Sequence, residues 1–136
     1  MTFALITDEF SVSGELTEQD FTTLNKLGVS MLINARPDNE NDGQKNDEDF
    51  KILCEAHGIE YVHVPVKPGQ YSQNDIEKVA NAFNAASGKV HGLCKTGARA
   101  AHLWALSQKE AKCFDELQKK AQAQGYDLTM IKNHFE

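Results

Sequence analysis

The chain has 136 residues, of which 40% are hydrophobic and 25% are charged. These values are typical of one globular domain and exclude a disordered chain, a collagen-like repeat and a coiled coil. The 14 Lys and Arg residues against 20 Asp and Glu residues give a net charge of −6. This charge disfavours nucleic acid and anionic membrane surfaces as partners, because both attract basic proteins.

The N-terminus and the cysteines indicate the compartment. No apolar stretch approaches the roughly 18 residues of a membrane span. Residues 1–9 carry no basic segment and no apolar core of the length that a signal peptide needs. Cys54, Cys94 and Cys113 form no C-x-x-C pair, so neither a zinc site nor a disulfide framework is indicated. We therefore expect a cytoplasmic protein with reduced thiols.

Helix and strand patterns alternate in the first half of the chain, which favours an α/β fold. Thr17 is a candidate N-cap, and apolar residues at helical spacing follow it until Gly28 ends the helix. We expect a buried strand at residues 29–34, a polar loop at residues 36–43 and a second helix at residues 47–57.

The second half continues this alternation. Its predicted strands are residues 59–66 and 89–93, with a turn at residues 67–70. The first predicted helix of this half begins after an N-cap at Ser72 or Asn74 and ends at Gly88. Three further helices are predicted at residues 100–111, 114–123 and, as a short last helix, 126–135. The sequence contains no internal repeat or interdomain linker, so residues 1–136 are expected to form a single domain.

The most informative segment is residues 90–101, where a predicted strand runs into a loop and then a helix. Cys94 directly follows this strand, and in open α/β sheets ligands bind at the carboxyl ends of the strands. Backbone N–H groups of the loop and the N-terminus of the next helix favour an anion there, so Cys94 is expected to be a thiolate near neutral pH. Arg99 can bind the same anion with its guanidinium fork, and Lys95 adds positive charge.

A structural role for these residues is the alternative. Free cysteines are commonly buried and inert, so Cys94 would be a core thiol and Arg99 a surface side chain. The histidines His63, His91 and His102 are also expected to be structural, because they do not cluster and no pair has the spacing of metal ligands. We therefore predict no metal site.

Several pieces of the sequence resemble known families. Residues 94–99, with the spacing Cys-x4-Arg and a glycine in the loop, resemble the active loop of rhodanese-type sulfurtransferases. The pattern of the whole chain resembles the cysteine-dependent phosphatase superfamily, and most specifically the bacterial family of phosphatase-like domains of beta-lactamase hydrolase-like proteins. The matching pieces are residues 12–17, 32–38, 61–66 and 94–99.

The resemblance implies an α/β, phosphatase-like three-layer fold, with a central, mostly parallel sheet flanked by helices. It implies that Cys94 is the nucleophile and that Arg99 is the bidentate partner of the bound anion. The backbone of the loop would cradle that anion through Lys95, Thr96, Gly97, Ala98 and Arg99. No metal or organic cofactor is implied, and the substrate would be a small anion.

The chain departs from the phosphatase pattern at two places. Its loop is one residue shorter than the Cys-x5-Arg loop of those enzymes, and Leu93 precedes the cysteine where they usually have histidine. Residues 66–70, where they supply an acidic proton donor, contain no acid. Asp38, just past the predicted strand at 29–34, is the best substitute, and its alternative role is to shape its own turn.

These observations leave three hypotheses about function. The first is a phosphatase-like enzyme that hydrolyses a phosphate ester through a phosphocysteine on Cys94. The second, which the short loop favours, is a rhodanese-like sulfurtransferase that takes sulfur from a sulfane sulfur donor and holds it as a persulfide on Cys94. The third is a weakly active anion-binding module, which the missing proton donor favours.

Overall fold

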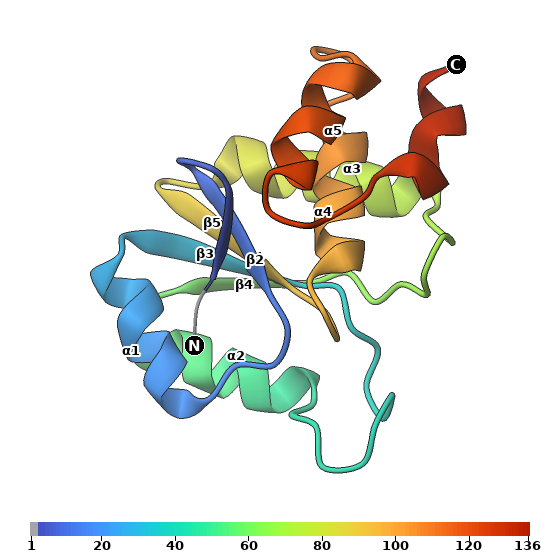
Figure 1. The fold of residues 1–136 in the computed structure, drawn as a ribbon. Helices are drawn as coiled ribbons and strands as arrows, with labels where there is room; N and C mark the ends of the chain where they lie inside the picture. The colour runs from blue at the N-terminus through green and yellow to red at the C-terminus, as the bar shows by residue number, and fades with distance from the viewer. Residues whose placement is uncertain (1–2) are drawn as a thin grey trace.

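A five-stranded sheet forms the centre of the computed structural model, which describes residues 3–136 (Figure 1). The strands are β1 (Ala4–Thr7), β2 (Phe10–Ser13), β3 (Val29–Asn34), β4 (Glu60–His63) and β5 (Lys89–Leu93). They lie in the order β1-β2-β5-β3-β4. The edge strand β1 pairs with β2 in antiparallel fashion, and the other neighbours are parallel.

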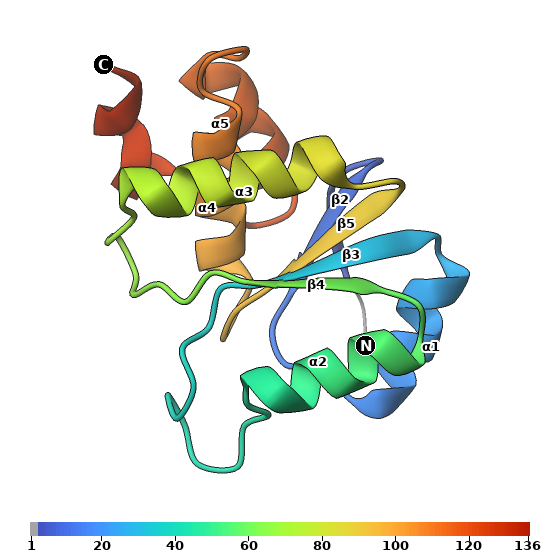
Figure 2. The same ribbon diagram turned by 180° about the vertical axis from the view of Figure 1, so that it is seen from behind.

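Helices cover both faces of the sheet, as the view from behind shows (Figure 2). One face carries α1 (Glu18–Lys26) and α2 (Asp47–Ala56), and the other carries α3 (Gln73–Ala85), α4 (Ala98–Ser107), α5 (Phe114–Gln122) and the 3-10 helix η1 (Thr129–Phe135). Each face has its own apolar core. This arrangement confirms the predicted three-layer α/β fold. Within residues 3–136, no helix is long and apolar enough to cross a membrane.

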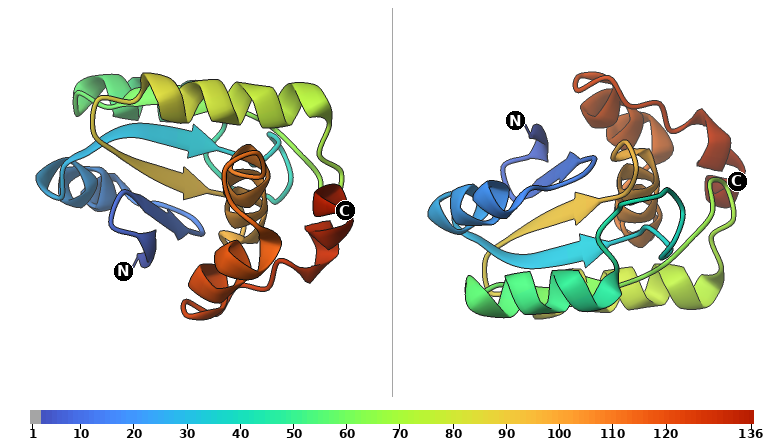
Figure 3. Two further views of the ribbon diagram at one scale, coloured as in Figure 1. Left: turned by 90° about the horizontal axis from the view of Figure 1, so that it is seen from above. Right: turned by 90° about the horizontal axis from the view of Figure 1, so that it is seen from below.

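The parallel strands bring their carboxyl ends to one edge of the sheet. In the views from above and below, the arrowheads of β3 and β5 point in the same direction (Figure 3). The segment after β3, residues 35–46, and the loop after β5, residues 94–97, therefore begin side by side, and Ala35 donates a backbone hydrogen bond to Leu93. This is the edge at which open α/β sheets bind ligands.

Three helices begin with the same reciprocal cap. Thr17, Asn46 and Ser72 each accept a hydrogen bond from the backbone of an aspartate three residues later, whose carboxylate accepts in return from the cap backbone. The predicted Thr17 cap is confirmed, and of the two candidates for α3 the structure uses Ser72.

The observed elements differ from the predicted ones in four places. Strands β1 and β2 were not expected, because the alternating serines of β2 resemble a loop; in the structure His91 hydrogen-bonds Ser11 and Ser13 and so satisfies both. The strand predicted at 59–66 shortens to β4, although the N–H groups of Val64 and Val66 still donate to the carbonyl oxygens of Asn34 and Ala35. The helix after Cys94 begins at Ala98 and ends at Ser107, rather than spanning residues 100–111. The last segment is a 3-10 helix.

Replacing Leu24 with alanine is expected to lower the free energy of unfolding by about 2–5 kcal/mol, because its buried side chain would leave a cavity. Leu27→Ala is the matched control at the end of the same helix. Its side chain is 52% exposed, so the change should stay within about 0.5 kcal/mol. Urea denaturation of both variants measures the difference, and equal losses would contradict the described packing of α1.

Candidate active site

Cys94 lies at the carboxyl end of β5, and its side chain is fully buried. Because side chains alternate along a strand, Leu93 packs with the core beside α1 and α2, whereas Cys94 packs with the core beside α3 and α4. Two backbone N–H groups donate hydrogen bonds to the Cys94 sulfur, from Gly97 at 3.1 Å and from Arg99 at 3.3 Å. The sulfur therefore faces two backbone donors of the loop.

Glycine residues allow the loop to take this shape. Gly97 is the N-cap of α4 and has a φ of 98°, in the left-handed region that other residues avoid. Gly14 packs against the same loop, where a Cβ atom would lie 2.7 Å from the carbonyl oxygen of Lys95. Lys95 and Thr96 are exposed at the rim.

Arg99 is the first-turn arginine of α4, and a carboxylate holds its guanidinium in place. Its Nη1 and Nη2 atoms each donate to Glu40, at 2.8 Å, and Nη1 also donates to the carbonyl oxygen of Val66 at 2.9 Å. The guanidinium has two further donors, the Nε–H and the second Nη2–H, which lie together on its other edge. Burial lowers the pKa of Arg99, but the hydrogen bond to Glu40 and the nearby Cys94 sulfur outweigh it and raise the pKa overall.

Arg36 supports Glu40 from the other side. Arg36 is buried, and its Nε donates to Glu40 at 3.0 Å, while its terminal nitrogens reach Glu15 at 3.2 Å and Asn41 at 2.6 Å. The hydrogen bond from Arg99 is the main reason that the pKa of Glu40 lies below its usual range. The sequence does not single out Glu40 as a site residue, because nothing in residues 36–43 distinguishes it from the neighbouring acids.

Asp38 lies in the same loop as Glu40 but has a different contact. Its side chain is exposed, and its carboxylate accepts a hydrogen bond from the backbone N–H of Asp47 at 2.8 Å, at the start of α2. This bond agrees with the turn-shaping alternative. The role of Asp38 as a proton donor stays a prediction.

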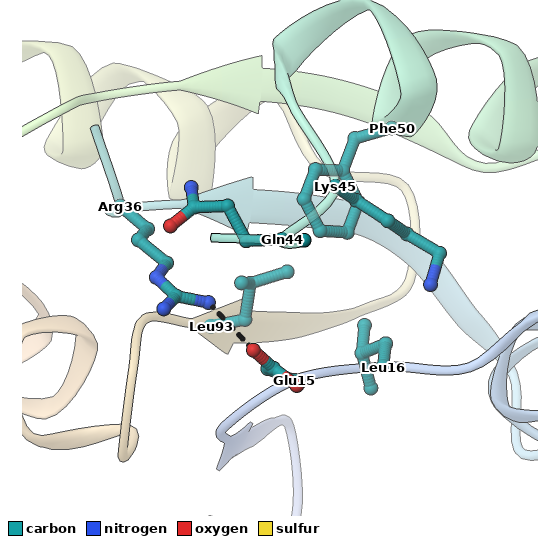
Figure 4. A pocket seen from close by; sticks show the side chains of 8 residues that line it. Glu15, Leu16, Arg36, Gln44, Lys45, Phe50 and Leu93 are labelled. Atoms are coloured by element: carbon teal, nitrogen blue, oxygen red, sulfur yellow. Dashed lines mark hydrogen bonds and ion pairs between the residues drawn. The ribbon is translucent and has the colours of Figure 1, made fainter. Parts of the chain in front are cut away.

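A small cavity lies beside the site, on the α1 and α2 side of the strand ends (Figure 4). Its volume is about 40 Å³, and it is lined by Glu15, Leu16, Arg36, Gly43, Gln44, Lys45, Phe50 and Leu93. A water molecule takes up roughly 30 Å³ in the liquid, so the cavity suits a water molecule rather than a phosphate ester. Cys94 does not line it, and we therefore do not assign it to the substrate.

The histidines near Cys94 have structural partners. His91 is fully buried between Ser11 and Ser13, with hydrogen bonds of 2.7 and 2.8 Å, and burial lowers the pKa of His91 to about 3. His102 hydrogen-bonds the phenol of Tyr71 at 2.8 Å, and burial lowers the pKa of His102 as well. Both are therefore neutral at physiological pH. Within residues 3–136, no cluster of three or more His, Cys, Asp or Glu side chains could hold a metal ion.

The fold and the cysteine loop together define a phosphatase-like α/β domain. The sequence matches the family model described as "Beta-lactamase hydrolase-like protein, phosphatase-like domain" over residues 2–111. The chain belongs to this family. This result confirms the resemblance that residues 94–99 and the rest of the motif pattern indicated.

Curated relatives are named beta-lactamase hydrolase-like proteins. A beta-lactamase hydrolase-like protein of Agrobacterium fabrum (strain C58) is 32% identical over 103 residues, which are 76% of this chain and 24% of that protein. A relative of the same description from Xylella fastidiosa (strain Temecula1) is 30% identical over 125 residues, which are 90% of this chain and 29% of that protein. The chain thus spans about a quarter of the length of these relatives.

Solved structures share the fold. A crystal structure from Neisseria meningitidis Z2491, described as a "putative phosphatase", has a TM-score of 0.85 and 27% identity, and the alignment covers 100% of this chain and 97% of that chain. The crystal structure of human DUSP28 has a TM-score of 0.70 and 12% identity, and the alignment covers 99% of this chain and 94% of that chain. At this identity the similarity concerns the fold alone. The comparisons favour the phosphatase hypothesis over the sulfurtransferase hypothesis.

Glu40→Gln is expected to destabilise the protein at neutral pH, and the loss should shrink in acid. A carboxylate whose folded pKa is depressed stabilises the protein above its ordinary value of 4.5, and the contribution is lost as the pH falls through the folded pKa. Urea denaturation across pH measures the difference in unfolding free energy from wild type. The exposed Glu110→Gln is the control, with no comparable trend. A loss that does not depend on pH would contradict the role of the Glu40 charge.

Proposed function

We propose that this domain hydrolyses the phosphate monoester of a small anionic substrate, with Cys94 as the nucleophile. The observation that carries the proposal is the pair of backbone N–H groups, from Gly97 and Arg99, directed at the Cys94 sulfur. Membership of a phosphatase-like family supports it. The positive end of α4 and the guanidinium of Arg99 favour both the thiolate and an oxyanion next to it.

In the first step the Cys94 sulfur attacks the phosphorus atom of the ester. The S–P bond forms as the bond from phosphorus to the leaving oxygen breaks, and a phosphocysteine results. The backbone N–H groups of residues 95–99 and the free Nε–Nη2 edge of Arg99 stabilise the non-bridging oxygens. Glu40 acts through Arg99, since it binds the Nη1–Nη2 end of the guanidinium and so directs the Nε–Nη2 edge away from itself.

In the second step a water molecule attacks the phosphocysteine. The new O–P bond forms, the S–P bond breaks with its electron pair on sulfur, and inorganic phosphate leaves as H2PO4⁻ with both protons of the water while Cys94 returns to the thiolate. The N–H groups that favour the nucleophile in the first step also favour the sulfur as a leaving group in the second. One arrangement of donors therefore serves both steps.

Incubation of the protein with an aryl phosphate is expected to release phosphate, and Cys94→Ser should reduce the rate on the order of 10³-fold or more, because the alcohol is a far weaker nucleophile than a thiolate. Rapid acid quench and mass spectrometry of the Cys94 peptide should detect the phosphoryl adduct. Cys113→Ser, which changes an exposed cysteine outside the site, is the matched control.

A parallel sample with thiosulfate tests the sulfurtransferase alternative. Addition of one sulfur atom to the Cys94 peptide, without a phosphoryl adduct in the first sample, would overturn the proposed function in favour of sulfur transfer. Neither adduct would favour the anion-binding module.

Asp38→Asn tests the candidate proton donor. If Asp38 protonates the leaving oxygen, the variant should hydrolyse phenyl phosphate about 10²–10⁴-fold more slowly, whereas an aryl phosphate with an acidic leaving group should change little because it needs no proton. Steady-state kcat for the two substrates measures this contrast. If hydrolysis of both substrates slowed equally, Asp38 would not be the proton donor. Its role would then be the turn contact with the backbone N–H of Asp47.

A further inference from the structure

Tyr126 contacts the anion loop from a segment that lies outside the matched family model, which ends at residue 111. Its phenol donates a hydrogen bond to the carbonyl oxygen of Thr96, with an oxygen–oxygen distance of 2.8 Å. The same phenol oxygen lies against Gly97, where a Cβ atom would come within 2.5 Å of it. The glycine is therefore needed for this contact as well as for the left-handed turn.

The contact fixes the orientation of one peptide unit. The carbonyl group of Thr96 and the N–H group of Gly97 belong to the same planar trans peptide, so they point in opposite directions. Tyr126 holds the carbonyl end, and the N–H end points at the Cys94 sulfur at 3.1 Å. If this unit turned over, a carbonyl oxygen would face the sulfur in place of a donor and would disfavour the thiolate.

The segment around Tyr126 is attached firmly to the domain. The backbone N–H of Tyr126 donates to Ala121 at the end of α5, and the carbonyl oxygen of Asp127 hydrogen-bonds His102 on α4. Gln118 donates to the Asp127 carboxylate at 2.6 Å. Figure 1 shows this connection from α5 to η1 passing across α4. Burial, with the nearby Cys94, raises the pKa of Tyr126, so its phenol stays a donor at neutral pH.

We propose that Tyr126 is a positioning residue, which keeps the N–H of Gly97 directed at the Cys94 thiolate and so makes the C-terminal segment part of the catalytic unit. The inference rests on the proposed role of Cys94 as a thiolate nucleophile. Without the phenol, the Thr96–Gly97 peptide samples both orientations. The hydrogen bond from the Gly97 N–H to the sulfur is then partly lost, and with it part of the stabilisation of the negative charge.

The test is Tyr126→Phe in the full chain, which removes one oxygen atom and keeps the ring. The rate of alkylation by iodoacetamide is followed against pH and read on the Cys94 peptide by mass spectrometry. The midpoint is expected to rise by about one pH unit relative to wild type, and kcat/KM for an aryl phosphate to fall about 10-fold at a pH below both midpoints. Tyr61→Phe is the matched control, because Tyr61 bonds Asn34 and Asp47 rather than the loop.

The outcomes separate this inference from the proposed function. An unchanged midpoint in Tyr126→Phe, or an equal rise in Tyr61→Phe, overturns the positioning role even if thermal stability falls. A wild-type midpoint at the free-thiol value of about 8.5 overturns both the positioning role and the nucleophile. A low wild-type midpoint that rises in Tyr126→Phe, in a protein that hydrolyses no aryl phosphate, supports the positioning role and overturns only the phosphatase proposal.

Discussion

The proposed role of Cys94 puts a negatively charged sulfur inside the protein, and such a charge is stable only where N–H groups replace its water. Cys94 is fully buried, and the donors that reach it come from the Gly97 and Arg99 backbone. Directing both at one atom requires a left-handed residue at the start of α4 and a neighbour without a side chain, which Gly97 and Gly14 provide. The geometry of the loop thus follows from the electrostatic need of a single atom.

The positive charge of the two arginines at the site is partly neutralised by a carboxylate. Glu40 lies between two arginines and compensates one of them, so the group Arg36, Glu40 and Arg99 keeps about one positive charge. Glu15, the other acidic partner of Arg36, is 69% exposed, and solvent screens its charge. A protein with a net charge of −6 can therefore attract an anion at this edge, while the ion pairs hold the arginines in fixed orientations.

The parts of the site that the sequence predicts are those whose determining contacts are local. The cysteine, the glycine and the arginine of residues 94–99 lie within one loop, and the donors to the sulfur come from three and five residues away. The sequence does not reveal Glu40, Val66 or the Tyr126 contact, which are 59, 33 and 30 residues from their loop partners. Strand β2 could not be predicted for the same reason, because its serines hydrogen-bond a histidine about 80 residues away. Such pairs depend on the folded sheet, and no spacing rule reports them.

The described contacts to the anion loop come from distant parts of the sequence. Those that shape the anion loop come from Gly14 on one side of the sequence and from Tyr126 on the other, so they lie within this chain although it spans only about a quarter of its curated relatives. The loop is one residue shorter than the usual phosphatase loop and so offers one amide fewer to an oxyanion. A loop with fewer donors depends more on the orientation of each. External contacts at Glu40 and Tyr126 then matter more than they would in a longer loop, because they fix the donors that remain.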